Sequence, residues 1–286
     1  TADYAFDYTD AHDTPSPYVL TYLASGKTNP VAIFVPGAPH YAGIPLDLYV
    51  SPTSRASTVS VNGGYNNMPI FEAERIWAHS LTVSDEIGGV TVRSITGYRW
   101  TDWAQSLDLD GSPLPVAASY RGTTFHNFSE EINASGTFDD LTFTSGIYYY
   151  SDGGGTVNPQ QFFYAASQQF PLYSYSTTAY ALYTQVDYVP RFLDDNLVLT
   201  AGLRYSNESK FGGRYQYNIT GAHMNAAGVA VGGSAPLVVF PEGTEASKNF
   251  DDTTPTFIAK YDLSPAINIY AKYAQGFKSG GINDEA

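Results

Sequence analysis

The sequence of 286 residues contains no cysteine, which excludes both a disulfide framework and a thiolate metal site. Charged residues are also scarce, at 15% of the chain against roughly 25% in an average soluble domain. The 14 Lys and Arg residues are outnumbered by 28 Asp and Glu, giving a formal net charge of −14. This balance indicates that nucleic acid is not a partner, because a phosphate backbone requires cations. A run of about 18 apolar residues, the length that a transmembrane helix needs, is missing too.

Glycine and aromatic residues are abundant instead, with 26 Gly, 24 Tyr and 16 Phe. The mean hydropathy is −0.21, so the chain is polar although few of its residues are charged. Ser, Thr, Asn, Gln and Tyr supply that polarity. Such a composition suits β-strands and turns, in a sheet that has one apolar face and one wet face.

Alternation of apolar and polar residues with a period of two is the dominant pattern, as expected for half-exposed strands. The segment 197–206 places Leu197, Leu199, Ala201, Leu203 and Tyr205 on one face and Val198, Thr200, Gly202, Arg204 and Ser206 on the other. The same pattern recurs without helical interruption, so we predict an all-β, antiparallel fold. Nine strands are expected, at residues 2–11, 70–85, 89–103, 123–135, 138–150, 176–189, 197–209, 254–263 and 267–277.

The predicted connectors alternate between long and short. Long ones are expected at residues 12–69, 104–122, 151–175 and 210–253. Short ones are expected at residues 86–88, 135–137, 190–196 and 264–266. Compact soluble domains seldom carry several structureless loops longer than about 15 residues, whereas a transmembrane barrel has short turns at one rim and long extracellular loops at the other. The pattern therefore favours a transmembrane β-barrel.

Tyrosines gather near the ends of the predicted strands, at Tyr148, Tyr149, Tyr150, Tyr173, Tyr175, Tyr205, Tyr215 and Tyr217. A ring with an apolar body and a polar tip is suited to the boundary between membrane and water. The intrinsic strand propensity of tyrosine explains the same positions equally well.

Several segments resemble TonB-dependent receptors. Ile269 to Asn283 resembles the strand-and-loop motif LYASYSRGFKSGGFN of that family, and Leu199 to Tyr205 matches its LTAGLRY strand. Further similarity is found in Asp251–Pro255 with Ala259–Tyr261, in Ser94–Arg99 and in Phe128–Ile132. These matches occur in the family's order and cover most of residues 90–283.

The resemblance implies a bacterial outer-membrane barrel of the large, plugged kind, which imports scarce nutrients and is not an enzyme. The family's plug domain and the short box that engages the TonB complex would precede the barrel, and a last strand ending in an aromatic residue would follow it. None of these is recognised here, and the sequence opens within a strand-like pattern without a leader. We therefore expect residues 1–286 to be an internal part of one barrel domain, contributing about nine strands.

Catalytic and metal-binding patterns are mostly missing from the sequence. The five histidines have no ligand spacing, and the adjacent Glu130 and Glu131 point to opposite faces of a strand, so they cannot act as an acid–base pair. Asp108–Gly111 matches part of a calcium loop, but the position of its final glutamate holds Ala117. Gly153–Gly155 follows a strand and is interpreted as a flexible loop. We predict no catalytic residue, no metal site and no cofactor.

The long loops are the expected place of ligand capture. Aromatic residues in residues 151–175 could stack on a chelate or sugar, namely Phe162, Phe163, Tyr164 and Tyr173. Arg204 and Lys272 are expected to face the lumen. The resemblance makes an iron–siderophore chelate the first expected ligand, with a vitamin or an oligosaccharide as alternatives, beside outer-membrane lipid and the TonB complex as partners. A passive porin and a secreted carbohydrate-binding β-sandwich stay open as other classes.

Overall fold

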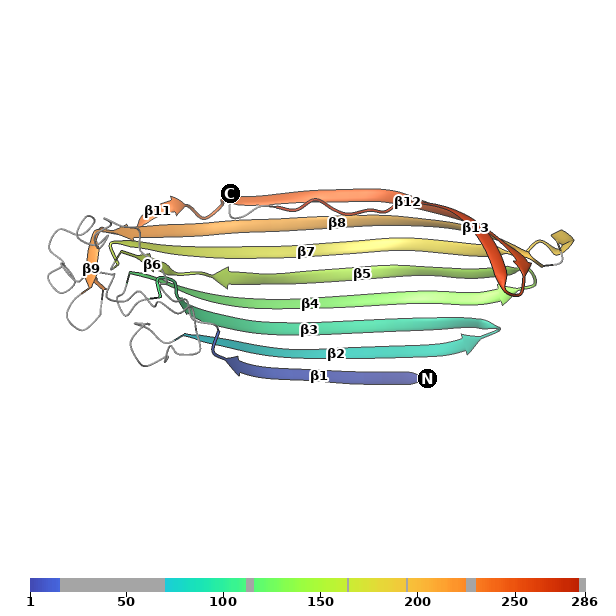
Figure 1. Cartoon of the computed structure of the whole chain (residues 1–286), viewed down its shortest axis with the longest axis horizontal. Coiled ribbons are helices and arrows are strands. Elements are labelled where there is room, and N and C mark those ends of the chain that lie inside the picture. The colour runs from blue at the N-terminus through green and yellow to red at the C-terminus, as the bar shows by residue number, and fades with distance from the viewer. Residues whose placement is uncertain (16–69, 112–115, 164, 194, 225–229, 283–286) are drawn as a thin grey trace.

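The computed structural model describes residues 1–15, 70–111, 116–163, 165–193, 195–224 and 230–282. Nine long strands run side by side along the molecule (Figure 1). They are β1 (Ala2–Asp13), β2 (Phe71–Ile87), β3 (Val90–Asp108), β4 (Ala117–Phe138), β5 (Leu141–Val157), β7 (Ser167–Tyr188), β8 (Leu197–Thr220), β12 (Glu245–Ser264) and β13 (Ile267–Ala274). The expected all-β, antiparallel fold with nine long strands is confirmed.

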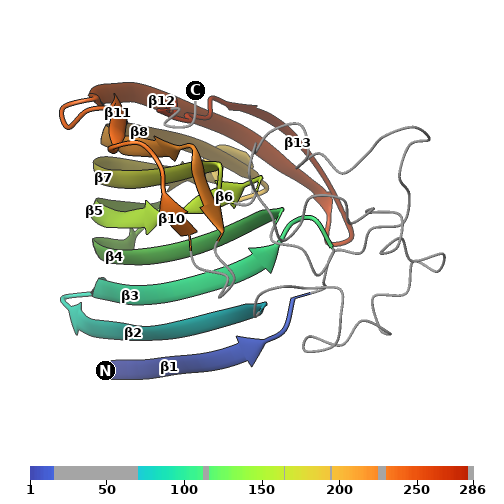
Figure 2. The ribbon, with the colours of Figure 1, turned by 90° about the vertical axis from the view of Figure 1, so that its left-hand side faces the viewer.

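Each long strand pairs antiparallel with the long strand that follows it in the chain, in the order β1-β2-β3-β4-β5-β7-β8-β12-β13. Two short strands, β6 (Gln160–Phe162) and β11 (Leu237–Phe240), extend this sheet at one end, and β9 (Ala222–Met224) pairs with β10 (Ala230–Gly232). The sheet curves into a trough (Figure 2). Within the described residues β1 and β13 are its two edges, because each pairs with one neighbour only.

The short turns lie together at one end of the sheet (Figure 1). Gly88 and Gly89 join β2 to β3 with positive φ angles of 59° and 83°, as the tight turn of a hairpin requires. The turn between β4 and β5 consists of Asp139 and Asp140. The turn predicted at residues 135–137 was therefore placed too early in the sequence, within β4. Asp139 adopts a φ of 49°, a conformation that Asp tolerates better than most residues.

The longest of these connections, between β7 and β8, contains the 3-10 helix η3 (Arg191–Leu193). Arg191 Nε lies 2.7 Å from Asp140 Oδ2, which ties this connection to the neighbouring turn between β4 and β5. The hydrogen bond to Asp140 raises the pKa of Arg191, so the guanidinium remains charged.

At the opposite end, the strands continue into segments that were predicted to be loops. Residues 104–108 and 117–122 belong to β3 and β4, residues 151–157 and 167–175 to β5 and β7, and residues 210–220 to β8. The physical reason is that Ser, Asn and Gly interrupt the apolar outer face just beyond the predicted strand ends, as at Ser209 and Gly213, so the alternation weakens while the backbone ladder continues. Gly153–Gly155 is likewise a paired part of β5 and not a flexible loop. The predicted loop at residues 12–69 begins with β1, and its residues 16–69 lie outside the described part of the chain.

The outer face of the sheet carries an apolar band beside the short turns. Its side chains are exposed, as for Ile147 (54%), Leu182 (61%), Leu203 (50%) and Phe257 (54%). On β8 the band runs from Leu197 to Tyr205, nine residues, which matches the roughly 9–11 that a tilted strand needs to cross a bilayer.

Aromatic residues mark the end of this band that lies away from the short turns. Phe128, Tyr149, Tyr180 and Tyr205 mark it on β4, β5, β7 and β8, and Tyr8, Trp77 and Trp100 mark it on β1, β2 and β3. Tyr148, Tyr150, Tyr173 and Tyr175 lie on the inner face instead. The expected boundary role therefore suits only some of the clustered tyrosines.

Hydrophobic packing between two layers does not hold this fold together. Among the described residues, the buried hydrophobic ones are only Ile70, Ala118, Ala165, Ala181 and Ala222. A β-sandwich would bury one face of each sheet in a shared core. The alternative of a secreted carbohydrate-binding β-sandwich is therefore wrong.

Candidate functional site

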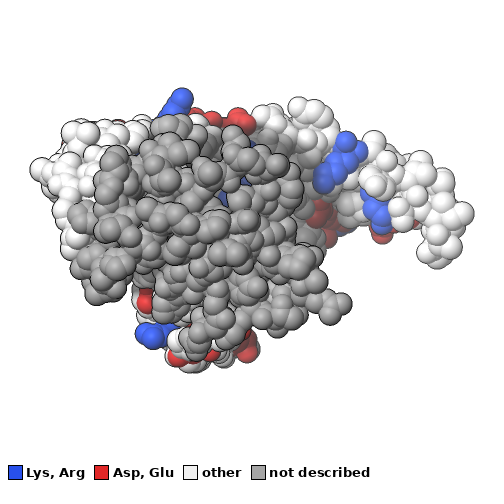
Figure 3. All heavy atoms as spheres, turned by 60° about the vertical axis from the view of Figure 1, so that its left-hand side comes forward, with Lys and Arg blue, Asp and Glu red and all other residues white. Residues whose placement is uncertain are grey.

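The inner face of the sheet, on the side of the trough, carries the polar and charged side chains. Ten Lys and Arg residues lie on described strands, and the register of the ladders places all but Arg75 on this face. The nine are Arg93, Arg99, Arg121, Arg204, Lys210, Arg214, Lys248, Lys260 and Lys272. The charged groups of the described atoms form only a few small clusters in Figure 3. This face is therefore where a polar ligand could be bound.

Arg214 forms the centre of a cluster on this face, in the part of β8 beyond the apolar band. Its guanidinium carbon lies 4.0 Å from the ring centroid of Phe240 on β11 and 5.5 Å from that of Tyr173 on β7. Arg214 Nη2 donates a hydrogen bond of 2.6 Å to Gln216 Oε1, and Gln216 Nε2 donates one of 2.8 Å to Asn218 Oδ1. We call these five residues the arginine cluster. It holds a cation between aromatic rings, a favourable arrangement for both partners.

Of the four aromatic residues predicted to bind ligand, only Tyr173 belongs to the arginine cluster. It lies on a strand and not on a loop, directly opposite Arg214 in the ladder. Phe162 and Phe163 are near each other, with ring centroids 6.4 Å apart, and Phe163 has a positive φ of 55°. Phe162 pairs with Ser167, which is six residues along β7 from Tyr173. The Phe162–Phe163 pair is therefore separated from the arginine cluster by about 20 Å along the strand. Tyr164 lies outside the described residues.

Arg204 lies on the inner face at the level of the apolar band. Its guanidinium is 5.6 Å from the ring centroid of Tyr183 and 6.0 Å from that of Tyr148. Glu131 is the neighbouring anion, and its Oε1 accepts hydrogen bonds from Tyr183 Oη at 2.7 Å and from Asn133 Nδ2 at 2.9 Å. This network connects β4, β5, β7 and β8 across the inner wall.

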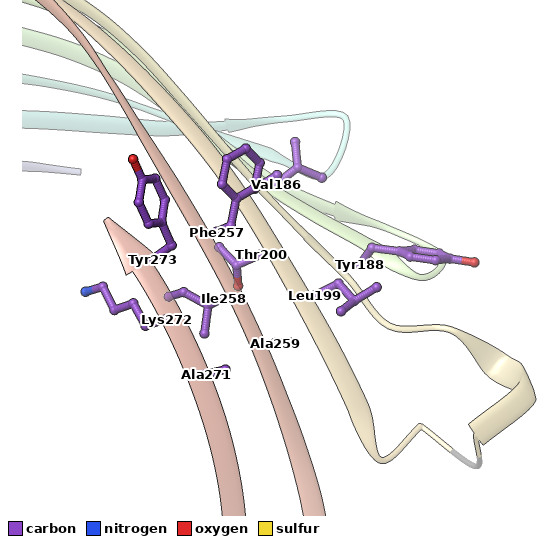
Figure 4. A pocket seen from close by; sticks show the side chains of 11 residues that line it. Val186, Tyr188, Leu199, Thr200, Phe257, Ile258, Ala259, Ala271, Lys272 and Tyr273 are labelled. Atoms are coloured by element: carbon purple, nitrogen blue, oxygen red, sulfur yellow. The ribbon is translucent and has the colours of Figure 1, made fainter. Parts of the chain in front are cut away.

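Lys272 is on the inner face of the edge strand β13. In Figure 4 its side chain extends to the opposite side from Tyr188 and Leu199. A recess of about 620 Å³ lies nearby and is framed by Tyr188, Leu199, Phe257 and Tyr273 of the apolar band, which Figure 4 labels. This recess is lined mainly by apolar side chains of the outer face, so it is not suited to a polar ligand.

The segment after β13, residues 275–282, lies against the inner face. Gln275 N donates to Pro255 O at 3.0 Å, and Ser279 Oγ donates to Glu208 Oε2 at 2.5 Å. A Cβ added to Gly280 would lie 2.7 Å from the ring of Phe250, so a larger residue would require this ring to move. Of the three glycines in this motif, only Gly280 packs closely on the inner wall, because a Cβ on Gly276 or Gly281 would meet nothing within 4 Å.

The carboxylates of the partial calcium loop bind backbone groups. Asp108 Oδ1 accepts hydrogen bonds from the backbone N–H groups of Asp110 and Gly111, both at 3.1 Å, and Asp110 Oδ2 accepts one from Ala117 N. No group of three or more His, Cys, Asp or Glu that could hold a metal ion is found in the described residues. No helix in the described residues is long and apolar enough to cross a membrane.

Sequence reasoning missed Arg214, Gln216, Asn218 and Phe240 as candidate ligand-binding residues. All four lie in residues 210–253, which had been predicted to be a loop, where no face can be assigned. The pairing of Phe240 with Gln216 depends on a register that has a β-bulge, and no local signal in the sequence predicts it.

Comparison with solved structures supports the fold. The chain is similar to the ferric-catecholate import receptor Fiu from E. coli K12 in its closed form, with a TM-score of 0.55 and 13% identity over 96% of this chain and 40% of the receptor. It is similar to the siderophore receptor PiuA from Acinetobacter baumannii, with a TM-score of 0.54 and 12% identity over 96% of this chain and 39% of that one. It is also similar to the ferric yersiniabactin uptake receptor FyuA from Yersinia pestis, with a TM-score of 0.54 and 12% identity over 75% of this chain and 29% of that receptor.

The chain thus spans less than half the length of these three receptors, and the identities are low enough that they bear on the fold alone. A search of curated protein sequences finds no match. The family described as TonB dependent receptor-like, beta-barrel matches residues 3–285, almost the whole sequence. Proteins of this family are transporters and not enzymes, and they reside in the outer membrane of Gram-negative bacteria. The chain belongs to the β-barrel family of TonB-dependent receptors.

Proposed function

We propose that the whole protein imports an iron–siderophore chelate across the outer membrane, with energy supplied through the TonB complex. Membership of the receptor family supports the class of activity. The siderophore is suggested by the names of the structurally similar receptors, PiuA, Fiu and FyuA. A vitamin and an oligosaccharide are the competing ligands.

The observation that carries this proposal is the arginine cluster. It lies on the inner face, beyond the apolar band and away from the short turns, at the end of the barrel that faces the outside in this class of proteins. Its guanidinium carbon lies 4.0 Å from the ring centroid of Phe240 and 5.5 Å from that of Tyr173. Such a group can bind carboxylate or catecholate oxygens of a chelate, while the rings pack against its organic part.

Phe162, Phe163, Tyr164 and Tyr173 remain the proposed aromatic contacts of the ligand. In this proposal Tyr173 acts together with Arg214 on the wall, and Phe162 and Phe163 act farther outward, at the end of β6. Arg204 and Lys272 then line the path that the ligand follows through the lumen.

The nine strands form part of a single closed barrel in this proposal. Two open edges in lipid would each leave a row of backbone groups unpaired, at a cost of several kcal/mol for each group. Further strands beyond β1 and β13 remove these edges. A plug domain inside the barrel, displaced through the TonB complex, then controls passage.

The test is uptake by the full-length receptor in a bacterial strain that lacks its own siderophore receptors. Cells under iron limitation are supplied with radioactive iron bound to a catecholate, a hydroxamate or a carboxylate siderophore. We expect at least one chelate to be taken up, and the uptake to stop in a strain without TonB. Uptake that continues without TonB would indicate a passive porin, and uptake of only a vitamin or an oligosaccharide would reject the siderophore.

Two variants test the arginine cluster. Arg214→Gln removes the charge and Tyr173→Leu removes the aromatic ring, so each should weaken binding of the transported chelate by about tenfold, as the loss of about 1.5 kcal/mol implies. Tyr215→Leu is the matched control, because Tyr215 neighbours Arg214 on β8 but lies on the outer face. Equal losses in all three variants would show that the cluster has no special role in binding.

A further inference from the structure

The outer face changes character directly beyond the aromatic end of the apolar band. Beyond it, many outward-facing positions of β5, β7, β8 and β12 carry hydroxyl and amide side chains, while Asp251 on β12 is charged. The row nearest the band is Ser151, Thr178, Ser209 and Asn249, which the ladders place side by side. Ser174, Ser176, Asn207 and Ser247 lie around it on the same face. We call these eight residues the hydroxyl belt.

The side chains of the first row are free to bind something outside the protein. Each is half-exposed or exposed, and within the described residues none donates or accepts a side-chain hydrogen bond. Hydroxyl groups inside the apolar band behave differently. There Ser145 Oγ lies 2.7 Å from Thr184 Oγ1, and Ser94 Oγ donates to Glu130 Oε1 at 2.6 Å. Polar groups that face hydrocarbon are thus paired with each other, while those of the belt are not.

The belt lies at the depth of the lipid head groups. Its first row is two residues beyond Tyr149 and Tyr180, and the next row is four residues beyond them, which corresponds to about 7 and 13 Å along the strand. A strand tilt of roughly 40° brings these values to about 5 and 10 Å along the membrane normal. The polar layer of a bilayer begins at the edge of the hydrocarbon and is about 5–8 Å thick on each side. Because the short turns face the periplasm, this is the outer leaflet.

The absence of positive charge in the hydroxyl belt argues against phosphorylated lipid head groups as its binding partner. Phosphorylated lipid head groups are bound by Lys and Arg, and none of the eight belt positions carries a cation. The seven Lys and Arg residues on strands β4 to β13 all lie on the inner face. The charged outward side chains next to the belt are Asp251, Glu245 and Glu130, which repel phosphate.

We propose that the hydroxyl belt binds the sugar head groups of an outer-leaflet glycolipid that presents no phosphate to the protein. Serine hydroxyls and asparagine amides donate and accept hydrogen bonds to sugar hydroxyls without requiring a charge. Phe211 follows Ser209 on the outer face of β8 and offers a ring against which the apolar face of a sugar packs. The inference concerns the membrane around the receptor and does not depend on which ligand the receptor transports.

The experiment uses the full-length receptor in nanodiscs of phosphatidylcholine that contain a small fraction of either an uncharged monohexosyl ceramide or lipid A. The lipids that stay bound to the purified receptor are counted by native mass spectrometry. We expect the hexosyl ceramide to be enriched about threefold or more over its bulk fraction, since each new hydrogen bond contributes a factor of this order. Lipid A should not be enriched.

Variants then assign the enrichment to the belt. Alanine at Ser151, Thr178, Ser209 and Asn249 should abolish the enrichment of the hexosyl ceramide, and the triple variant Ser151→Lys, Thr178→Lys, Ser209→Lys should bind lipid A instead. The control is the double variant Thr177→Lys, Ser206→Lys on the inner face. It should change neither the enrichment of the hexosyl ceramide nor that of lipid A. Enrichment of lipid A by the unmodified receptor, or the same composition for bound and bulk lipid, would overturn the proposal even if a variant failed to fold.

Discussion

Tyr183 connects two strands that are not neighbours. Its ring crosses β5 above Gly146, where an added Cβ would lie 2.6 Å from Tyr183 Oη, and its hydroxyl reaches Glu131 on β4. The absence of a side chain at residue 146 is therefore what allows the hydrogen bond. Arg204 on β8 lies 5.6 Å from the same ring, so one tyrosine connects β4, β7 and β8 through side chains.

We predict that Tyr183→Phe lowers the free energy of unfolding of the full-length receptor by about 1 kcal/mol, because it removes a hydrogen bond to a half-buried carboxylate. The midpoint of urea unfolding, followed by the altered gel mobility of the folded barrel, measures this change. Tyr180→Phe is the control, since that hydroxyl lies on the outer face with 52% of the residue exposed. If both variants lose the same stability, the link across β5 contributes nothing.

At the scale of the strand, Gly153 and Gly154 of β5 differ in how much space a side chain would find. A Cβ on Gly154 would come into contact with the backbone oxygen of Thr124 and lie 3.1 Å from Tyr175 Oη, whereas a Cβ on Gly153 would have its nearest contact, 3.5 Å away, with His126. Tyr175, which also stacks on Phe125 with ring centroids 6.2 Å apart, therefore covers the gap that Gly154 leaves in the inner wall.

Gly154→Ala should destabilise the barrel by about 1–3 kcal/mol, since the backbone of β4 must move to accept the methyl group. Gly153→Ala should change stability little or even raise it slightly, because alanine is better than glycine in a paired strand. Urea unfolding of the two variants in the same detergent gives the comparison. Similar destabilisation by both would mean that the approach of β4 to Gly154 is not as close as described.

The part of each strand inside the apolar band could be predicted from the sequence, whereas the part beyond the band could not. From Leu197 to Tyr205 one face is apolar and the other polar, and this part of β8 was predicted. From Ser206 to Gly213 the apolar face is interrupted by Asn207, Ser209 and Gly213, so the period of two weakens there, although the ladder to β7 continues to Thr220. The residue-level prediction failed for the same reason. Tyr173 was chosen as a loop aromatic, while Arg214, its partner across the ladder, was lost in a predicted loop.

At the scale of the whole molecule, the two faces of the sheet divide the chemistry between them. The outer face is apolar in the band and uncharged above it on β5, β7 and β8, whereas the inner face holds nine of the ten strand cations. A chain with few cations can therefore keep most of them where a polar ligand passes. The apolar band predicts how the protein is positioned in the membrane, and a single added charge can test that position.

Ala201 is at the centre of the band on β8, four residues from both Leu197 and Tyr205, and it faces outward. Ala201→Arg should therefore destabilise the receptor in phosphatidylcholine vesicles by about 2–4 kcal/mol, the cost of an arginine at the middle of a bilayer. Ser209→Arg, on the same strand and face but beyond Tyr205, should cost at most about 1 kcal/mol, since its charge reaches the head groups. Urea unfolding in these vesicles measures both. Equal costs would place Ser209 in hydrocarbon as well, and the boundary at the aromatic row would then be wrong.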